Sequence, residues 1–245
     1  MHEHKNDIKG FISSSKTPDA DKEIYRKLYV KAQALLEKGQ RFLEKKENLH
    51  PLDQEGCYFR SVSGSTLHRG FYCPSPVQDI IVGNRKRGKL LRRETKRSNV
   101  SHRYVFNKDS ELLSIDNLYN GNVFATEHLQ RRGSQIYGFT IDKADRVYAV
   151  SEELYHDDVL EHYTVVYYLF VKGTYSVTKT YDEHYRYNEQ GLCECDYLIC
   201  DYPIGHIQKQ TYRFVCQDGY LISYCAIENN NTASQQYIIE PSRKV

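Results

Sequence analysis

The stretch Gly83-Asn-Arg-Lys-Arg-Gly88-Lys89 is the part of the sequence that comes nearest to a known chemical motif. Its glycines and lysine have the spacing of a loop that cradles phosphate groups. Such a loop also needs a serine or threonine hydroxyl after the lysine to hold magnesium, whereas the next residue here is Leu90. Neither a helix nor a parallel β-unit is predicted around it. The pattern therefore favours a basic hairpin turn over a nucleotide site.

A second candidate is the group Asp157, Asp158, Glu161 and His162, which falls within six residues. Carboxylates beside an imidazole can do acid–base or metal chemistry. Residues 155–158, which overlap the start of this group, have the composition of a turn between two strands. Exposed carboxylates are ordinary in such a turn. We therefore interpret the group as part of a hairpin.

Other nucleophiles and ligands do not form a convincing set. Ser63, Ser65 and His68 are close in sequence, but a nucleophile and its base usually come from distant segments. Of the ten histidines, only His2 and His4 stand at a usual metal spacing. The sequence thus predicts no catalytic residue, no metal site and no cofactor.

The cysteines favour reduced thiols. There are seven, an odd number, without a C-x-x-C pair. Cys193 and Cys195 lie two residues apart in a predicted strand, so they should share its apolar face with Tyr197 and Ile199. We expect small core residues there and not zinc ligands.

Charge is segregated along the chain, although the net charge is only +2. Residues 84–103 carry nine Lys or Arg against Glu94, a balance of 9 − 1 = +8. Residues 142–201 carry thirteen acids and five bases, 5 − 13 = −8. Either segment could be a solvated surface or could meet a partner of opposite charge.

The basic segment supports the alternative hypothesis of a nucleic-acid-binding module. Lys and Arg would give salt-sensitive phosphate affinity, but the aromatic residues that stack on unpaired bases are absent between Asn84 and His102. An exposed basic hairpin is the preferred interpretation. The candidate phosphate-contacting residues are Arg85, Arg87, Arg92, Arg93 and Arg97.

One long helix is expected near the N-terminus, within residues 17–50. Thr17-Pro18-Asp19 has the composition of a helix start, and apolar residues such as Ile24, Leu28, Ala32 and Leu35 then recur at helical spacing. We predict a disordered tail over residues 1–16. No apolar run there suits a signal peptide, and nowhere do eighteen apolar residues follow one another, so we expect a cytoplasmic protein without membrane contact.

Residues 51–245 are expected to form one antiparallel β-sheet domain, with tyrosine-rich hairpins over residues 102–228. Tyr163–Val171 is apolar on both faces, which is typical of a strand in the middle of a covered sheet. The fold class is therefore mainly β: a large antiparallel β-meander with the N-terminal helix packed on one face. The hairpins begin with four aromatic-x-aromatic segments, each leading into a polar turn: Tyr104–Phe106, Tyr137–Phe139, Tyr185–Tyr187 and Tyr212–Phe214.

The unit Tyr185-Arg-Tyr-Asn188-Glu-Gln-Gly191-Leu192 resembles the tyrosine-aspartate (YD) repeat of bacterial RHS proteins and, more loosely, MORN-variant repeats. About four degenerate copies make the chain similar to small cytoplasmic immunity proteins of bacterial polymorphic toxin systems. This resemblance implies a sheet that binds a cognate toxin domain and covers its active site. It implies no catalytic residue.

The expected function is therefore protein binding. A sheet rich in tyrosine offers a rigid contact platform, and the acidic segment could face a basic toxin such as a nuclease. The candidate partner-binding residues are Asp157, Asp158, Glu161, Tyr155, Tyr185 and Tyr187.

Overall fold

The computed structural model describes residues 19–45, 59–61, 75, 77, 102–217, 220–227 and 233–238. The predicted tail, residues 1–16, and most of the basic segment, residues 84–101, lie outside these ranges. The chain forms two compact units, residues 1–34 with 153–245 and residues 35–152. One helix and one strand run through the division.

The described chain contains one long helix, α2 (Asp19–Lys45), and twelve strands. The helix lies within the range predicted from the sequence. The strands are β1 (Phe59–Ser61), β2 (His102–Phe106), β3 (Leu112–Tyr119), β4 (Asn122–Arg132), β5 (Gln135–Asp142), β6 (Val147–His156), β7 (Val159–Val171), β8 (Thr174–Asn188), β9 (Gly191–Asp201), β10 (His206–Gln217), β11 (Tyr220–Ile227) and β12 (Ala233–Ile238).

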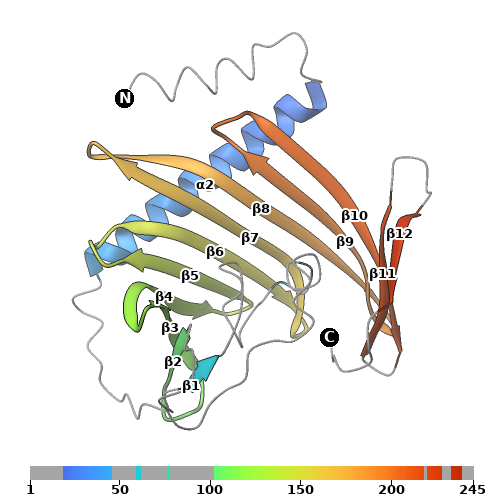
Figure 1. The fold of residues 1–245 in the computed structure, drawn as a ribbon, viewed down its shortest axis with the longest axis horizontal. Helices are drawn as coiled ribbons and strands as arrows, with labels where there is room; N and C mark the ends of the chain where they lie inside the picture. Colours follow the sequence, from blue (N-terminus) through green and yellow to red (C-terminus); the bar gives the residue numbers. More distant parts are fainter. Residues whose placement is uncertain are drawn as a thin grey trace. The chain divides into compact units, whose positions relative to one another are not determined.

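Strands that follow one another in sequence also lie side by side in the sheet (Figure 1). Every pair with a resolved register is antiparallel, from β1 with β2 to β11 with β12. The predicted fold class is confirmed: the protein is a mainly β, antiparallel meander of tyrosine-rich hairpins, with an N-terminal helix packed on one face.

The helix buries a stripe of apolar side chains against the sheet in each unit. In the unit that contains residues 1–34, the rings of Tyr25 and Tyr29 lie 5.1 and 5.6 Å from the ring of Tyr202. The Tyr168 hydroxyl donates to the carbonyl of Ala32 at 2.7 Å. In the other unit the ring of Phe42 stacks on a sheet phenylalanine at 4.5 Å.

The strand expected in the middle of a covered sheet is β7. Its residues Tyr163, Thr164, Val165 and Val166 are all buried, although successive side chains of a strand point to opposite faces. The prediction of burial on both faces is therefore confirmed for residues 163–166, whereas Leu169 and Val171 near the end of the strand are half exposed. The helix covers the face that carries Thr164, since Lys31 of the helix contacts that hydroxyl.

Three of the predicted hairpins have the same type of turn. Asn107, Asp142 and Asn188 each accept a hydrogen bond through the side-chain Oδ1 from the backbone amide two residues later, at 3.0, 2.8 and 2.9 Å. The residue three positions after each has a positive φ, 61° at Ser110, 55° at Asp145 and 115° at Gly191. Asn and Asp suit such turns because their side chains bond the nearby backbone.

Two of these hairpins, those of Asn107 and Asn188, and the hairpin of β10 and β11 also have a bulge close to the turn. Tyr187 pairs with Leu192 and Arg186 with Glu194, so Cys193 is an extra residue in β9. Cys195 and Tyr197 are buried as expected, whereas Cys193 beside the bulge is only half-buried. Leu113 and Ile222 are the corresponding extra residues in β3 and β11.

A ladder of tyrosines crosses five neighbouring strands on the face opposite Thr164. Adjacent ring centroids are 6.0 to 6.4 Å apart. Cross-strand aromatic pairs of this kind contribute roughly 0.2–1 kcal/mol each. The ladder consists of Tyr167, Tyr181, Tyr197, Tyr212 and Tyr224.

Gly39 permits close approach of the helix to β6. A Cβ at this position would lie 2.9 Å from Cγ2 of Val150 and 3.0 Å from Cγ1 of Val147. We expect Gly39→Leu to lower the free energy of unfolding by about 1–3 kcal/mol through overpacking. Urea denaturation measures this change. The control Gln40→Leu, at an exposed position, should change the free energy of unfolding by no more than about 0.5 kcal/mol. Equal effects of the two changes would contradict the close packing.

The difference in burial predicts a difference in thiol reactivity. Burial raises the pKa of the Cys195 thiol above its ordinary value and that of Cys200 to about 12, whereas Cys193 is only half-buried. Iodoacetamide at about pH 8 should therefore modify Cys193 well before Cys195 or Cys200, because the thiolate is the reactive form. Peptide mass spectrometry measures this, and labelling in urea is the control that should remove the difference.

Candidate functional site

The predicted partner-binding acids lie together at one end of β6, β7 and β8. Asp157 and Asp158 form the two-residue turn between β6 and β7, with φ angles of 48° and 63°. This is the conformation of a tight hairpin turn, which aspartate tolerates better than most residues. Both side chains are exposed, and Glu161 is exposed on β7 a few residues later.

Tyr187 lies beside this turn from β8. Its hydroxyl donates to the carbonyl of Leu160 at 2.8 Å, which fixes the ring in place. Partial burial of the hydroxyl raises the pKa of Tyr187 above its ordinary value. The residue is nevertheless 39% exposed, and the neighbouring Val159 is 38% exposed. Together they give the acids an apolar centre.

We define the acidic end as Asp157, Asp158, Val159, Glu161, Tyr187 and Glu189, the last being exposed in the turn between β8 and β9. Asp157 lies 3.6 Å from the imidazole of His156. Within the described parts of the chain, no Lys or Arg forms an ion pair with these carboxylates. The acidic end is therefore a surface of net negative charge.

Many of the remaining acids between Asp142 and Asp201 have cationic partners. Arg186 bonds both Glu194 and Asp196, at 2.9 and 2.5 Å, and Arg213 also bonds Glu194 at 3.0 Å. The hydrogen bond from Arg186 holds the pKa of Asp196 below its usual range. Lys179 lies 3.2 Å from Asp201. These acids therefore have cationic neighbours, whereas those of the acidic end do not within the described chain.

The other two predicted partner-binding residues are less accessible. Tyr185 is only 5% exposed, and its hydroxyl donates to the buried carboxylate of Glu183. Tyr155 is half-buried and donates to Glu153 at 2.9 Å. The alternation of β8 places Tyr185 and Tyr187 on one face, as expected, but only Tyr187 reaches solvent.

The candidate phosphate-contacting arginines lie outside the described residues. They are Arg85, Arg87, Arg92, Arg93 and Arg97. At the end of the same basic segment, Arg103 is described, and its Nε donates to Asp116 at 2.6 Å. Thr126 donates to the other oxygen of Asp116 at 2.6 Å. Arg103 therefore already has a partly buried partner within the sheet.

The structure also brings together His162, Asp182 and His184, a group that the sequence did not predict. Nε2 of His162 lies 2.9 Å from Oδ1 of Asp182, and Nε2 of His184 lies 3.2 Å from Oδ2. The two imidazole rings stack with centroids 4.0 Å apart. The Asp182 carboxylate therefore interacts with both histidines, one at each oxygen.

Two further side chains complete this polar cluster beneath the helix. Thr164 donates to Oδ1 of Asp182 at 2.5 Å, and Lys31 of α2 donates to the Thr164 hydroxyl at 2.6 Å. Burial by itself would raise the pKa of Asp182, but hydrogen bonds from His162 and His184 outweigh it and hold that pKa well below its usual range. The buried carboxylate is thus ionised and well partnered.

These three residues could offer a metal one ligand atom each, since the atoms lie within 4.8 Å of one another. The nearly parallel stack does not aim both imidazole nitrogens at a common point. Lys31 adds a positive charge 3.6 Å from Asp182, which opposes a cation. The arrangement therefore fits a hydrogen-bonded network better than a metal centre.

Register explains why the sequence did not reveal this cluster. The two-residue turn Lys172-Gly173 sets Val171 opposite Thr174, a register that would place His162 opposite Glu183. A bulge at Thr178 shifts the pairing by one residue, so that His162 faces His184 and Thr164 faces Asp182. The sequence shows polar residues at alternate positions of these strands, but it does not show the bulge at Thr178 that brings them together.

The fold and the site define a tyrosine-rich antiparallel meander that presents an acidic, partly apolar end. No protein-family model matches the chain, and no curated protein matches it significantly. Among solved structures, a porin-like protein from Bacteroides vulgatus is similar to it, with 8% sequence identity and a TM-score of 0.32. The alignment covers 78% of this chain and 99% of that chain. A similarity this low supports no conclusion about function.

Within the described residues, α2 is too polar to cross a membrane, and no other helix there is long and apolar enough to do so.

The polar cluster should make stability depend on pH through Asp182. A depressed folded-state pKa contributes stability above the unfolded value of about 4, and this contribution is lost as the pH falls below it. We expect Asp182→Asn to lower the free energy of unfolding by about 2–4 kcal/mol near pH 7. The difference from the native chain should stay constant above about pH 5 and shrink as the pH falls from about 5 toward 2.

Urea denaturation across this pH range measures the effect. Glu161→Gln is the control, because that carboxylate is exposed and has no ion-pair partner in the described chain. A difference that stays constant with pH, or an equal effect of the control, would contradict the role given to Asp182.

Proposed function

We propose that this chain is a cytoplasmic protein-binding protein of the immunity type, which neutralises a cognate bacterial toxin by covering the toxin's active site. The observation that carries the proposal is the acidic end. It combines four exposed carboxylates with Val159 and Tyr187, which are each more than one third exposed. A partner with a basic surface would find complementary charge and an apolar contact in one place.

The composition of the acidic end suits protein recognition. Tyrosine is enriched among residues that dominate binding energy, and charges around such a residue speed the encounter. The Tyr187 hydroxyl is already bonded to Leu160, so binding would cost little side-chain entropy. The tight turn at Asp157 and Asp158 likewise holds two of the carboxylates in place.

The immunity role rests on the resemblance of Tyr185–Leu192 to the YD repeat. This unit forms the hairpin of β8 and β9, which borders the acidic end. A nuclease is the expected kind of toxin, because proteins that act on nucleic acid present basic surfaces to phosphate. An acidic surface placed over such an active site would exclude the substrate by charge as well as by shape.

Co-expression tests the proposal directly. The toxin domain encoded immediately upstream of this chain's gene should be lethal to bacteria when expressed alone and harmless when this chain is present. The two purified proteins should form a stable complex. If this chain does not protect the bacteria and no complex appears in size-exclusion chromatography, the proposal is wrong.

The acidic end should control the rate of association. The triple variant Asp157→Asn, Asp158→Asn, Glu161→Gln should associate with that toxin domain about tenfold more slowly at low salt, with a smaller difference at high salt. Asparagine is chosen because it tolerates the positive φ of this turn. Surface plasmon resonance measures both rates.

A matched pair of single changes provides the control. Asp158→Asn and Asp145→Asn each remove one exposed turn carboxylate at a positive φ, 63° and 55°. Only Asp158→Asn should slow association. Equal rates for the triple variant and the native chain would remove the acidic end from the proposed interface.

A further inference from the structure

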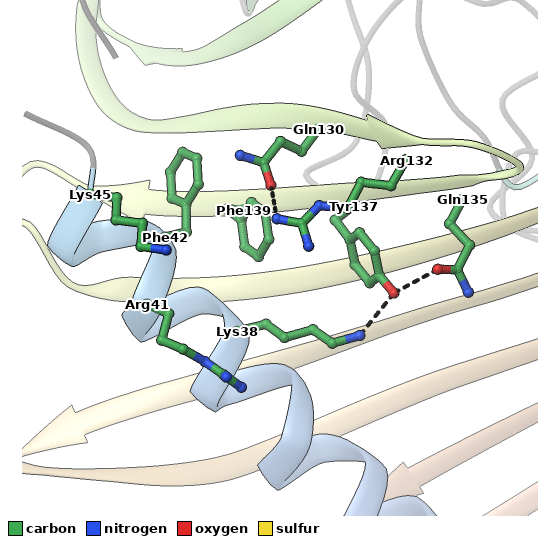
Figure 2. A pocket seen from close by; sticks show the side chains of 9 residues that line it. All are labelled: Lys38, Arg41, Phe42, Lys45, Gln130, Arg132, Gln135, Tyr137 and Phe139. Carbon is green, nitrogen blue, oxygen red and sulfur yellow. Dashed lines mark hydrogen bonds between the residues drawn. The ribbon is translucent and has the colours of Figure 1, made fainter. Parts of the chain in front are cut away.

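A cleft of about 620 Å³ lies between the C-terminal part of α2 and the hairpin of β4 and β5 (Figure 2). Its volume is in the range of small-molecule sites, roughly 300–1,000 Å³. All nine lining residues belong to one unit, residues 35–152, and none carries a carboxylate. They are Lys38, Arg41, Phe42, Lys45, Gln130, Arg132, Gln135, Tyr137 and Phe139.

The lining is strongly cationic. Lys38, Arg41 and Lys45 recur on one side of the helix, and Arg132 comes from the end of β4. A cation near a helix C-terminus also interacts favourably with the helix dipole, which accounts for Lys45 but not for Arg132. Charges from two separate elements therefore converge on one cleft.

Little of this charge is neutralised within the described chain. Arg132 bonds only the amide oxygen of Gln130, at 3.1 Å, and Lys45 has no acidic partner there. Arg41 pairs with Glu37 at 3.7 Å, but both side chains are mostly exposed, so the pair is weak. Lys38 alone has a partly buried acid, Glu152, at 3.5 Å. The cleft thus carries a surplus of positive charge.

Aromatic rings form the floor of the cleft. Phe42 stacks on Phe139 at 4.5 Å, and Phe139 lies 6.2 Å from the ring of Tyr137. Figure 2 shows Lys38 and Gln135 meeting at the Tyr137 hydroxyl, with bonds of 2.8 and 3.0 Å. Lys38 also lies over the Tyr137 ring, 4.2 Å from its centroid. An apolar floor is therefore rimmed by cations and amides.

From this geometry we propose that the cleft binds a small organic anion with a flat ring, the chemistry of a nucleoside phosphate. Lys45 and Arg132 bind the anionic group, and Gln130 and Gln135 supply amide hydrogen bonds to the ring substituents. The ring itself lies over the apolar floor. This site uses none of the residues of the acidic end and is independent of the proposed immunity function.

Isothermal titration calorimetry of the full chain with ATP, adenosine and tripolyphosphate tests the site. ATP should bind saturably, with adenosine and tripolyphosphate each at least about tenfold weaker, because each lacks one of the two complementary parts. The double variant Lys45→Gln, Arg132→Gln should weaken ATP binding by about tenfold or more. Both side chains are exposed, so the variant should remain folded.

The control is the double variant Lys108→Gln, Lys143→Gln, which removes the same charge from exposed turns outside the cleft and should bind ATP as the native chain does. Absence of saturable ATP binding, or equal ATP affinity in the two double variants, would overturn the site. Tripolyphosphate binding as tightly as ATP would overturn the place given to the ring.

Discussion

Strand register is the constraint on which the rest of this structure depends. Because side chains alternate between the two faces of a sheet, a shift of one residue moves every following side chain to the other face. The extra residue Thr178 makes that shift in β8, and its hydroxyl donates to the carbonyl of Tyr167 at 3.0 Å. The bulge is thus stabilised by its own side chain, and it decides which residues of β8 lie beneath the helix.

Register also places two different clusters on opposite faces of the sheet around β7, β8 and β9. The face beneath α2 carries a polar cluster in which Asp182 accepts hydrogen bonds from His162 and Thr164, and Lys31 of the helix forms an ion pair with it at 3.6 Å. The opposite face carries the tyrosine ladder, whose rings are hydrophobic surfaces of similar size. Polar groups gain most from partners when they are buried, and tyrosines gain most from packing beside one another. Register keeps these two sets apart.

The charges of the chain are arranged by the same hairpins. Arg186, Glu194 and Asp196 occupy neighbouring strands and neutralise one another, whereas the turn at Asp157 and Asp158 has no such neighbour among the described residues. Negative charge therefore remains where strands end. In the other unit, cations from α2 and β4 surround the aromatic cleft. Two surfaces of opposite sign result, although the net charge of the chain is close to zero.

Local pattern alone determined much of this protein. Helical spacing located α2, aromatic-x-aromatic segments located the hairpins, and Asn or Asp at the turns supplied the required backbone conformations, because these features depend only on residues close in sequence. The place of Asp157, Asp158 and Glu161 at a hairpin end followed from the same signals. The burial of Tyr185, the partial exposure of Cys193 and the meeting of His162 with His184 were decided only by the tertiary structure. Packing decides the first two, and the bulge at Thr178 decides the third. Both depend on contacts between segments, which no single segment encodes.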